Sequence, residues 1–323
     1  MAANVTIATV ARHANVSRQT VSNVLNAPEL VRAETRARVL AAIEELGYRT
    51  NLAARQMRTG RSRLIAVRID PAGDGAEQSV LDRFLHGLTE AAELVGYRIM
   101  LYTATDDRSE IATYEDLLAS YALDAFVLTH THHGDARTAW LAAAGVPFTT
   151  FGRPWGGVDQ HPWVDVDGAA GTAAATRHLL ALGHSRIGFL GWPKGSGVGD
   201  DRQHGWASTM RANGCDVARL DRHCVDGIGE GENVARELMR TSGPPTALIC
   251  ASDQLALGAR RVADVPIIGF DDSPMAQAAG LSSVRQPLGE AAAACVQLLT
   301  ALLDKGPGST ARHILLEPNL IIR

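Results

Sequence analysis

Apolar residues recur at helical spacing three times within the first 50 positions of the chain. The pattern predicts short helices that begin after Thr6 and that cover residues 17–25 and 33–46. The hydroxyl groups of Thr6 and Ser17 can accept hydrogen bonds from the free amides of a first helical turn. Asn15 tolerates the left-handed conformation that a tight turn between the first two helices needs. Together, the three segments predict a helix-turn-helix unit.

From residue 64 onward, short apolar runs alternate with segments of helical periodicity. The runs predict buried strands at residues 64–69, 98–102, 125–129, 146–151, 187–190, 247–251 and 267–270. The periodic segments predict helices at residues 79–95, 109–121, 135–144, 201–213, 231–241 and 254–263. Two such series predict two subdomains with a cleft at the carboxyl ends of their strands. The predicted fold class is α/β, with an all-α head in front of two doubly wound parallel sheets.

The charge of the chain is divided unevenly along its length. The net charge is −4, but residues 1–63 carry ten arginines against four glutamates, a balance of +6 that leaves −10 for the remainder. A basic head on an acidic body predicts a polyanion as the partner of the head and a different partner for the body. The alternative is a helical face that is merely well solvated.

The composition is that of an ordinary globular protein. The 323 residues are 46% hydrophobic and 20% charged, which allows two compact units and a smaller one. No apolar stretch approaches the roughly 20 residues of a membrane helix, and the N-terminus lacks the features of an export signal, so we expect a soluble, cytoplasmic protein. The four cysteines are 9, 26 and 45 positions apart, which fits neither a metal clip nor a disulfide framework.

Polar side chains cover the outward face of the second predicted helix. They are Arg18, Gln19, Thr20, Ser22 and Asn23. Arginine can donate two hydrogen bonds to guanine, glutamine or asparagine can pair with adenine, and serine or threonine suits phosphates. This helix is therefore the candidate DNA-recognition helix. The alternative is that its polar side chains are only those of an ordinary solvent-exposed helix.

Short motifs follow one another in a fixed order through the head. They are Thr6-Ile7, Val10-Ala11, Val16-Ser17, Thr20-Val21-Ser22, Val24-Leu25-Asn26, Thr35-Arg36 and residues 41–48. In this order they resemble the head of the LacI/GalR (lactose-repressor) family. Residues 51–60 are similar to the family's hinge, which becomes helical on operator DNA. The resemblance implies that paired hinges push an apolar wedge into the minor groove, and Met57 stands where most relatives have leucine.

The outward helical face and the resemblance together give the candidate DNA contacts. They are Thr6, Ser17, Arg18, Gln19, Thr20, Ser22, Asn23, Asn26, Arg32, Tyr48, Asn51, Ala54, Met57 and Arg58. Two of them depart from the family pattern. Arg32 stands where the family usually has a serine that caps the third helix. We expect that this departure weakens the cap and that the arginine contacts a DNA phosphate instead. Asn23 stands where several relatives carry arginine, which leaves the operator sequence open.

A second set of motifs runs through the body. They are Val166-Asp167, His178-Leu179, Leu182-Gly183-His184, Ile187, Arg202, Gly205-Trp206, Ala251, Asp253, Ala256, Gly258 and residues 268–272. They resemble the periplasmic-binding-protein-like core of the same family. The resemblance implies two subdomains with crossings near residues 183–184, 283–286 and 307. The expected domains are a DNA-binding head (1–49), a hinge and linker (50–63), an N-terminal core subdomain (64–183 plus 285–306) and a C-terminal core subdomain (184–284 plus 307–323).

The candidate effector contacts lie in or near this predicted cleft. The resemblance implies that Arg202 and Asp253 bind sugar hydroxyls, because a fixed guanidinium and a carboxylate suit a vicinal diol. A buried structural ion pair is the alternative. Trp155, Trp163 and Trp192 are expected in loops near strand ends, where an indole ring can stack on a sugar or pack as a plug.

Three aspartates near predicted strand ends complete the interpretation of the cleft. Asp70, after the first strand, and Asp271, after the last one of the second series, are further candidate effector contacts, and Asp272 can face the cleft beside Asp271. Asp167 precedes a helical segment, so we expect it to cap that helix rather than to contact an effector.

Two further patterns suggest other chemistry. Residues 130–133 read His-Thr-His-His and resemble a metal cluster, but we expect no nearby carboxylate or cysteine partners and favour a polar loop at the mouth of the cleft. Residues 195–199 are glycine-rich but lack the nucleotide-binding spacing and a Walker lysine, so we expect a flexible loop. The sequence carries no familiar catalytic motif, and we predict no metal, no cofactor and no enzymatic activity.

These observations predict a ligand-responsive transcriptional regulator, in its simplest form a repressor. It would bind a near-palindromic operator as a homodimer, without membrane contact, under the control of a sugar or oligosaccharide. The chain ends after an apparent strand at 320–322, so we expect no tetramerising C-terminal helix. The alternatives are a non-regulatory solute-binding protein, a corepressor-type regulator that responds to a purine or another non-sugar metabolite, and a dinucleotide-dependent enzyme. Two carboxylates within residues 70–75 would repel a pyrophosphate and weigh against the enzyme.

Overall fold

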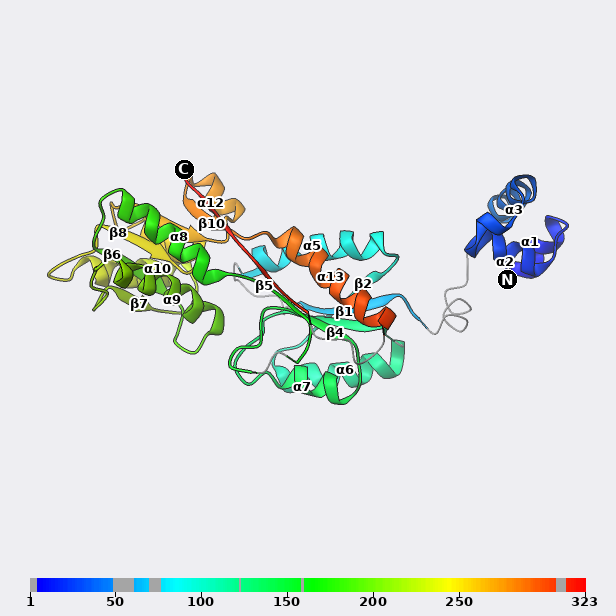
Figure 1. Cartoon of the computed structure of the whole chain (residues 1–323), viewed down its shortest axis with the longest axis horizontal. Coiled ribbons are helices and arrows are strands. Elements are labelled where there is room, and N and C mark those ends of the chain that lie inside the picture. Colours follow the sequence, from blue (N-terminus) through cyan, green and yellow to red (C-terminus); the bar gives the residue numbers. More distant parts are fainter. Residues whose placement is uncertain (1–4, 49–60, 70–76, 122, 158–159, 306–311) are drawn as a thin grey trace. The chain divides into compact units, whose positions relative to one another are not determined.

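The computed structural model describes residues 5–48, 61–69, 77–121, 123–157, 160–305 and 312–323. The chain divides into two compact units, Met1–Ser62 and Arg63–Arg323. The first unit is helical, and the second consists of two lobes, each a sheet covered by helices (Figure 1). Within the described residues, no helix is long and apolar enough to cross a membrane.

In its described residues, 5–48 and 61–62, the first unit packs three α-helices and one short 3₁₀ helix around a small apolar core. The elements are α1 (Ile7–His13), α2 (Arg18–Asn26), η1 (Pro28–Leu30) and α3 (Ala33–Leu46). The core contains Val10, Val21 and Val39, each fully buried. Apolar residues at helical spacing thus bury one stripe of each helix against the others, and the predicted three-helix head is confirmed.

Local capping chemistry fixes where these helices begin and end. Thr6 forms a capping box with Thr9, and the Ser17 hydroxyl oxygen accepts a hydrogen bond from the Thr20 amide at 3.0 Å. Asn15 has a φ of +52° in the turn between α1 and α2, and Gly47 has a φ of +61° after α3. Arg32 precedes α3 without a side-chain cap, as its departure from the serine pattern predicts.

The second unit contains a first sheet of six parallel strands. Their order is β11 (His313–Leu316), β5 (Trp163–Val166), β4 (Phe148–Phe151), β3 (Ala125–Leu128), β1 (Leu64–Ile69) and β2 (Arg98–Thr103). Helices α5 (Glu77–Leu94) and α13 (Leu288–Lys305) lie side by side in one apolar cluster, while α6 (Asp107–Tyr121) and α7 (Ala136–Ala143) contribute to another (Figure 1). Strand β1 supplies alternate residues to the two clusters, because successive strand side chains point to opposite faces.

A second six-stranded sheet forms the other lobe. Its order is β12 (Asn319–Ile321), β10 (Ser282–Arg285), β9 (Ile267–Phe270), β8 (Ala247–Cys250), β6 (Ile187–Gly191) and β7 (Asp221–His223), with β12 antiparallel to β10 and the other pairs parallel. Its helices are α8 (Gly168–Ala181), α9 (Gly197–Ala212), α10 (Ile228–Met239), α11 (Asp253–Ala259) and α12 (Pro274–Ala278). Helix α8 packs on α9, and α10 packs on α11. The two parallel-sheet subdomains predicted from the sequence are therefore present.

The chain crosses between the two lobes three times within the described residues. It crosses between β5 and α8, between β10 and α13, and between β11 and β12, where the red C-terminal segment runs from one lobe to the other (Figure 1). The crossing between β10 and α13, at residues 286–287, agrees with the one expected near residues 283–286, whereas the other two differ from the expected places. The expected boundary at residue 183 is wrong, because Ala175 and Leu179 of α8 bury their side chains in the core of the second lobe. The assignment of residues 307–323 to one subdomain is also wrong, because β11 pairs with β5 in the first sheet.

Candidate functional site

Helix α2 presents the polar face that the sequence predicts. Arg18 and Gln19 are exposed, and Thr20 and Asn23 are partly exposed. The Gln19 side-chain amide donates to the Asn23 side-chain oxygen at 2.9 Å, so each holds the other along the helix surface. Ser17 caps the helix and its hydroxyl lies 2.9 Å from that of Thr20. The face therefore offers both hydrogen-bond donors and acceptors to the major groove of DNA, which is wide enough to admit a helix.

The other candidate DNA contacts divide into three groups. Thr6 and Arg32 are exposed at the starts of helices, where side chains can meet a phosphate backbone. Tyr48 packs against the core of the first unit, and Ser22 is partly buried. The side chain of Asn26 and all of Asn51, Ala54, Met57 and Arg58 lie outside the described residues, so the proposed wedge is a prediction without a structural description.

The second unit contains a cavity of about 390 Å³ lined by both lobes, where strands of the two sheets end. It brings together five of the predicted effector contacts, which are Trp155, Trp192, Arg202, Asp253 and Asp271. Trp163 is not among its lining residues. The expectation of a loop position is wrong for that tryptophan, which lies in β5 with its ring stacked on His313 at a centroid distance of 4.8 Å. Asp70 lies outside the described residues.

Arg202 lines this cavity and is held in place by the close packing of α8 on α9. Its carbonyl oxygen accepts a hydrogen bond from the Thr172 hydroxyl at 2.7 Å, and α8 approaches so closely that a Cβ on Gly205 would overlap the Ala169 carbonyl. The guanidinium donates to the Ala251 carbonyl and lies 3.7 Å from the Phe270 ring centroid. Burial lowers the pKa of Arg202, while neighbouring carboxylates oppose that shift. A desolvated, fixed guanidinium of this kind is a directional donor.

The two aspartates that follow β9 have different roles. Asp271 lines the cavity, its Oδ1 lies 3.6 Å from an Arg202 nitrogen, and burial raises its pKa to about 7. Asp272 is fully buried and pairs with Arg285 and Arg323 at 2.6 Å each, so it does not face the cavity. The two residues have φ values of +108° and +49°, and a non-glycine residue adopts these angles only where its surroundings hold it.

Asp253 also serves the structure around the cavity. One carboxylate oxygen accepts from the Ser283 hydroxyl and the other from the Ser273 amide, each at 2.6 Å. Arg202 is therefore paired with Asp271, and the alternative of a structural pair between Arg202 and Asp253 is wrong. Burial raises the pKa of Asp253, with the serine hydrogen bonds acting in the opposite direction. Each oxygen retains a lone pair for a ligand hydroxyl.

The cavity combines buried donors that lack partners with a row of carboxylates. Among the described residues, the indole nitrogens of Trp155 and Trp192 and the Nε of Arg202 are buried without a hydrogen-bond partner. Further carboxylates at the cavity are those of Asp165, Asp201 and Asp226, which the sequence analysis did not identify. An unpaired buried donor costs about 1–3 kcal/mol, which a ligand oxygen would recover.

Residues behind the first lobe's part of the cavity hold its wall in place. Arg137 is 1% exposed and donates to the Thr129 and His130 carbonyls at 3.1 Å each. It also pairs with the fully buried Glu110 at 2.9 Å. Thr129, His130 and Thr131 line the cavity, so this buried ion pair positions a wall of the site.

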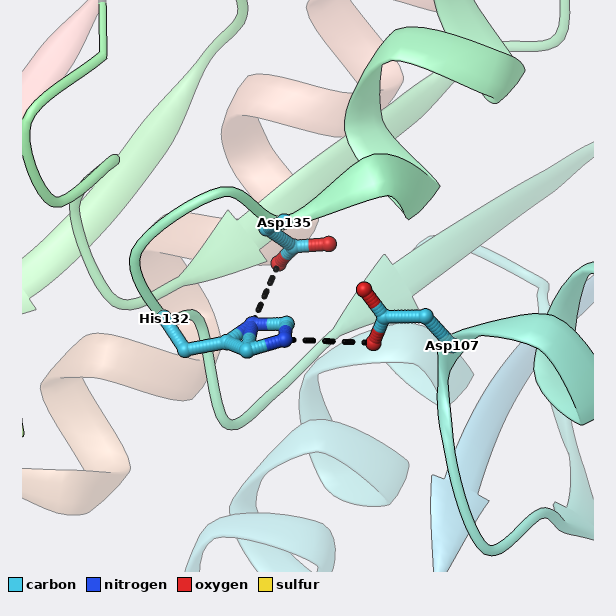
Figure 2. Close-up of side chains that lie close together, drawn as sticks. All are labelled: Asp107, His132 and Asp135. Atoms are coloured by element: carbon cyan, nitrogen blue, oxygen red, sulfur yellow. Dashed lines mark ion pairs between the residues drawn. The ribbon is translucent and has the colours of Figure 1, made fainter.

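The His-Thr-His-His segment contains one member of a small charged cluster. Figure 2 shows the His132 ring between Asp107 and Asp135, with nitrogen–oxygen distances of 3.3 Å and 3.6 Å. The expectation of no nearby carboxylate is wrong, since Asp135 lies three positions further along. Both Asp135 oxygens accept from Arg137 at 2.7 Å and 2.9 Å, and an Asp107 oxygen accepts from the Ala136 amide at 3.2 Å. The guanidinium thus occupies oxygens that a cation would need, and the cluster braces the β3–α7 loop.

Comparison with protein families matches both units. Residues 2–51 match the family described as bacterial regulatory proteins, lacI family, and residues 176–323 match a periplasmic binding protein-like domain. The HTH-type transcriptional regulator AglR of Rhizobium meliloti (strain 1021) is 33% identical over 80% of this chain and 75% of its own length. The HTH-type transcriptional regulator CelR of Thermobifida fusca is 30% identical over 98% of this chain and 97% of its own length.

Solved structures show the same architecture. A complex of the transcriptional regulator CelR with cellobiose is 28% identical and superposes with a TM-score of 0.73, covering 99% of each chain. The lac repressor dimer bound to operator and the anti-inducer ONPF is 26% identical with a TM-score of 0.81, covering 99% of this chain and 98% of the other. Both likenesses extend over the helical unit and the two-lobed unit.

Proposed function

Because the chain belongs to the LacI family of bacterial transcriptional regulators, we propose that it is a repressor whose grip on operator DNA depends on a neutral saccharide in the cavity of its second unit. The cavity carries this proposal. It offers three buried N–H donors without partners among the described residues, next to several carboxylates. A hydroxyl group both donates and accepts, so a polyol satisfies the two kinds of group together.

The charge of the cavity favours a neutral effector over an anionic one. Among the described residues, one guanidinium, that of Arg202, lines the cavity together with five aspartates: Asp165, Asp201, Asp226, Asp253 and Asp271. Arg153 pairs with Asp165 and Asp201, and burial raises the pKa of Asp271 to about 7, which reduces this excess of acidic groups but does not remove it. A phosphorylated sugar or a nucleotide would meet carboxylates at close range, whereas sugar hydroxyls can donate to them. The volume of about 390 Å³ falls within the roughly 300–1,000 Å³ range of small-molecule sites. The solved CelR relative holds cellobiose, which supports a saccharide here.

At the N-terminal unit we propose a homodimer on a near-palindromic operator, in the cytoplasm. One α2 helix per chain would read bases with Arg18 and Gln19, and the hinge over residues 50–63 would order on DNA with Met57 as its wedge. The lac repressor relative was solved as a dimer on its operator, which supports this arrangement. The regulator would act by binding alone, without catalysis and without a cofactor.

The proposed switch requires a difference in affinity. A saccharide that binds the DNA-competent and the released conformations equally well cannot change operator binding. A coupling of roughly 1–3 kcal/mol is typical of such systems, which corresponds to about a 5- to 150-fold change in operator affinity. By reciprocity, operator DNA must weaken saccharide binding by the same factor.

A thermal-shift screen of the full chain tests the cavity assignment. Neutral mono- and disaccharides, including cellobiose and maltose, are compared with glucose 6-phosphate, AMP and hypoxanthine. We expect at least one neutral saccharide to raise the melting temperature and the two phosphorylated compounds to leave it unchanged. Stabilisation by a phosphate or a purine alone would refute a saccharide effector while leaving the DNA-binding proposal intact.

A further inference from the structure

A tryptophan from one lobe lies directly on a helix of the other at the edge of the cavity. Trp155 is in the loop after β4, and Gly197 is the first residue of α9. A Cβ added to Gly197 would overlap Cγ and Cδ2 of the indole, so the ring lies against the glycine backbone. Trp155 also lines the cavity. One side chain thus contributes both to the wall of the site and to the contact between the lobes.

The same loop makes a second contact one helical turn further along α9. The Arg153 guanidinium pairs with Asp165 of its own lobe at 2.6 Å and reaches Asp201 of α9 at 3.5 Å. Its central carbon lies 4.9 Å from the Trp155 ring centroid, within the range of a cation–π contact. Gly197 and Asp201 are four residues apart, so they share one face of α9. The loop therefore docks on the start of the helix through an aromatic contact and an ionic one.

A third contact joins the lobes through backbone oxygens. Arg83 of α5 donates to the carbonyl of Asp271 at 3.1 Å and to that of Asp272 at 3.3 Å. These carbonyls belong to the segment with positive φ values, which also brings the Asp271 carboxylate to the cavity. The first lobe thus contacts the second at two separate places that also shape the cavity: the start of α9 and the segment Asp271–Asp272 after β9.

We propose that Trp155 and Gly197 form a closure gate, in which the absence of a side chain at position 197 allows the indole to seal the cavity when the two lobes come together. This inference rests on the proposed function. The gate makes saccharide affinity depend on a residue that does not line the cavity, because Gly197 acts through the position of Trp155. Any side chain at position 197 lowers the population of closed molecules, and the apparent affinity falls with that population.

Alanine at position 197 isolates the steric effect. Gly197 lies in α9 and has no positive φ, and alanine is the better helix former, so the substitution does not disfavour the helix itself. Gly229 of α10 provides a matched control. It is exposed, it also lies in the first turn of a helix, and a Cβ there would meet nothing within 4 Å.

The first measurement uses the full chain without ligand. Acrylamide quenching is recorded for the wild type, Gly197→Ala and Gly229→Ala, and the contribution of Trp155 is taken as the emission lost in Trp155→Phe. We expect Gly197→Ala to increase the accessibility of Trp155 and Gly229→Ala to leave it unchanged. Equal quenching of Trp155 in the wild type and Gly197→Ala overturns the gate.

The second measurement is calorimetric titration with whichever neutral saccharide of the thermal-shift screen stabilises the wild type most. We expect Gly197→Ala to weaken its binding by about tenfold or more, and the same change to have no further effect in a Trp155→Ala background. Equal affinity in the wild type and Gly197→Ala refutes the gate while the saccharide proposal stands. If no saccharide binds but the quenching difference is found, the effector assignment fails and the gate stands.

Discussion

Replacing Arg137 by methionine should lower the free energy of unfolding of the second unit and also loosen the cavity wall that Arg137 holds through the carbonyls of Thr129 and His130. Glu110 is fully buried, and its carboxylate accepts from Arg137 at 2.9 Å, from Arg68 at 2.8 Å, from Tyr102 at 2.8 Å and from Tyr114 at 2.7 Å. Burial alone would raise the pKa of Glu110, but Arg137 and the other donors lower it below its ordinary value. The carboxylate is therefore charged at neutral pH and depends on these partners.

The expected cost follows from what the substitution leaves unpaired. Methionine fills much of the volume of Arg137 but removes the bonds to Glu110, to Asp135 and to the carbonyls of Thr129 and His130. Removing one member of a buried ion pair costs about 3–5 kcal/mol, and Arg68 keeps part of the compensation. We expect a loss of about 4 kcal/mol in the free energy of unfolding.

A denaturant titration of the full chain measures this loss, with Trp140 as a local probe because its ring lies 5.8 Å from that of Tyr114. Arg98→Met is the control, since its ion pair with Glu93 is about two-thirds exposed and should contribute less than about 1 kcal/mol. Glu110→Gln combined with Arg137→Met should cost less than the sum of the two single changes. A loss below about 1 kcal/mol for Arg137→Met, or strict additivity, would refute the argument.

Three further predictions concern the head, the hinge and the cavity. Arg18→Ala or Gln19→Ala should relax base preference at a cost of roughly 1–3 kcal/mol per bidentate contact, measured by anisotropy on operator variants; uniform weakening would instead indicate phosphate contacts. Met57→Ala should reduce operator affinity and bending while leaving saccharide affinity of the free protein unchanged, and unaltered bending would remove the wedge. Because burial raises the pKa of Asp271 to about 7, the folded state holds a proton that the unfolded chain has lost, so stability should fall as pH rises from about 4 to 7, by up to about 1.4 kcal/mol per pH unit. Asp271→Asn should flatten that slope, and an identical slope in the variant would contradict the assignment.

The head could be predicted from sequence because its signals are local. Thr6, Ser17 and Asn15 each act on backbone groups within a few residues, and the structure uses them as caps and turns where the sequence analysis placed them. The strands of the body with continuous apolar runs were also predicted, since β3, β8 and β9 are buried along their whole length.

The strands near the crossings could not be predicted in the same way. β5 reads Trp-Val-Asp-Val, and its Asp165 is neutralised by Arg153, a partner 12 positions away. β11 is only half buried and becomes a strand through pairing with β5, about 150 residues earlier in the chain. Short strands of this kind, β5 inside the sheet and β11 at its edge, depend on their neighbours more than on their own composition, which explains the misplaced subdomain boundaries.

Only part of the site could be predicted from the sequence. Trp192 and Asp271 were identified because they follow strands β6 and β9, and Arg202 of α9 was identified through the family resemblance; all three lie at the cavity. Asp165 and Asp226 were missed because β5 and β7 were not predicted as strands. Trp163 was misassigned because an aromatic residue beside a proline resembles a loop but belongs to β5. The glycine-rich stretch at 195–199 was interpreted as a flexible loop, whereas Ser196 caps α9 there, and only the structure shows which indole Gly197 accommodates.

Operator binding by the full chain, with and without saccharide, tests the central claim most directly. A selected near-palindromic duplex is titrated by fluorescence anisotropy at low ionic strength and then challenged with the saccharide that raises the melting temperature. The account predicts tight binding of one dimer per duplex. It also predicts that a saturating concentration of the saccharide lowers operator affinity by about 5- to 150-fold. A protein that ignores duplex DNA under every condition, or that binds it equally well with its cavity filled, contradicts the account.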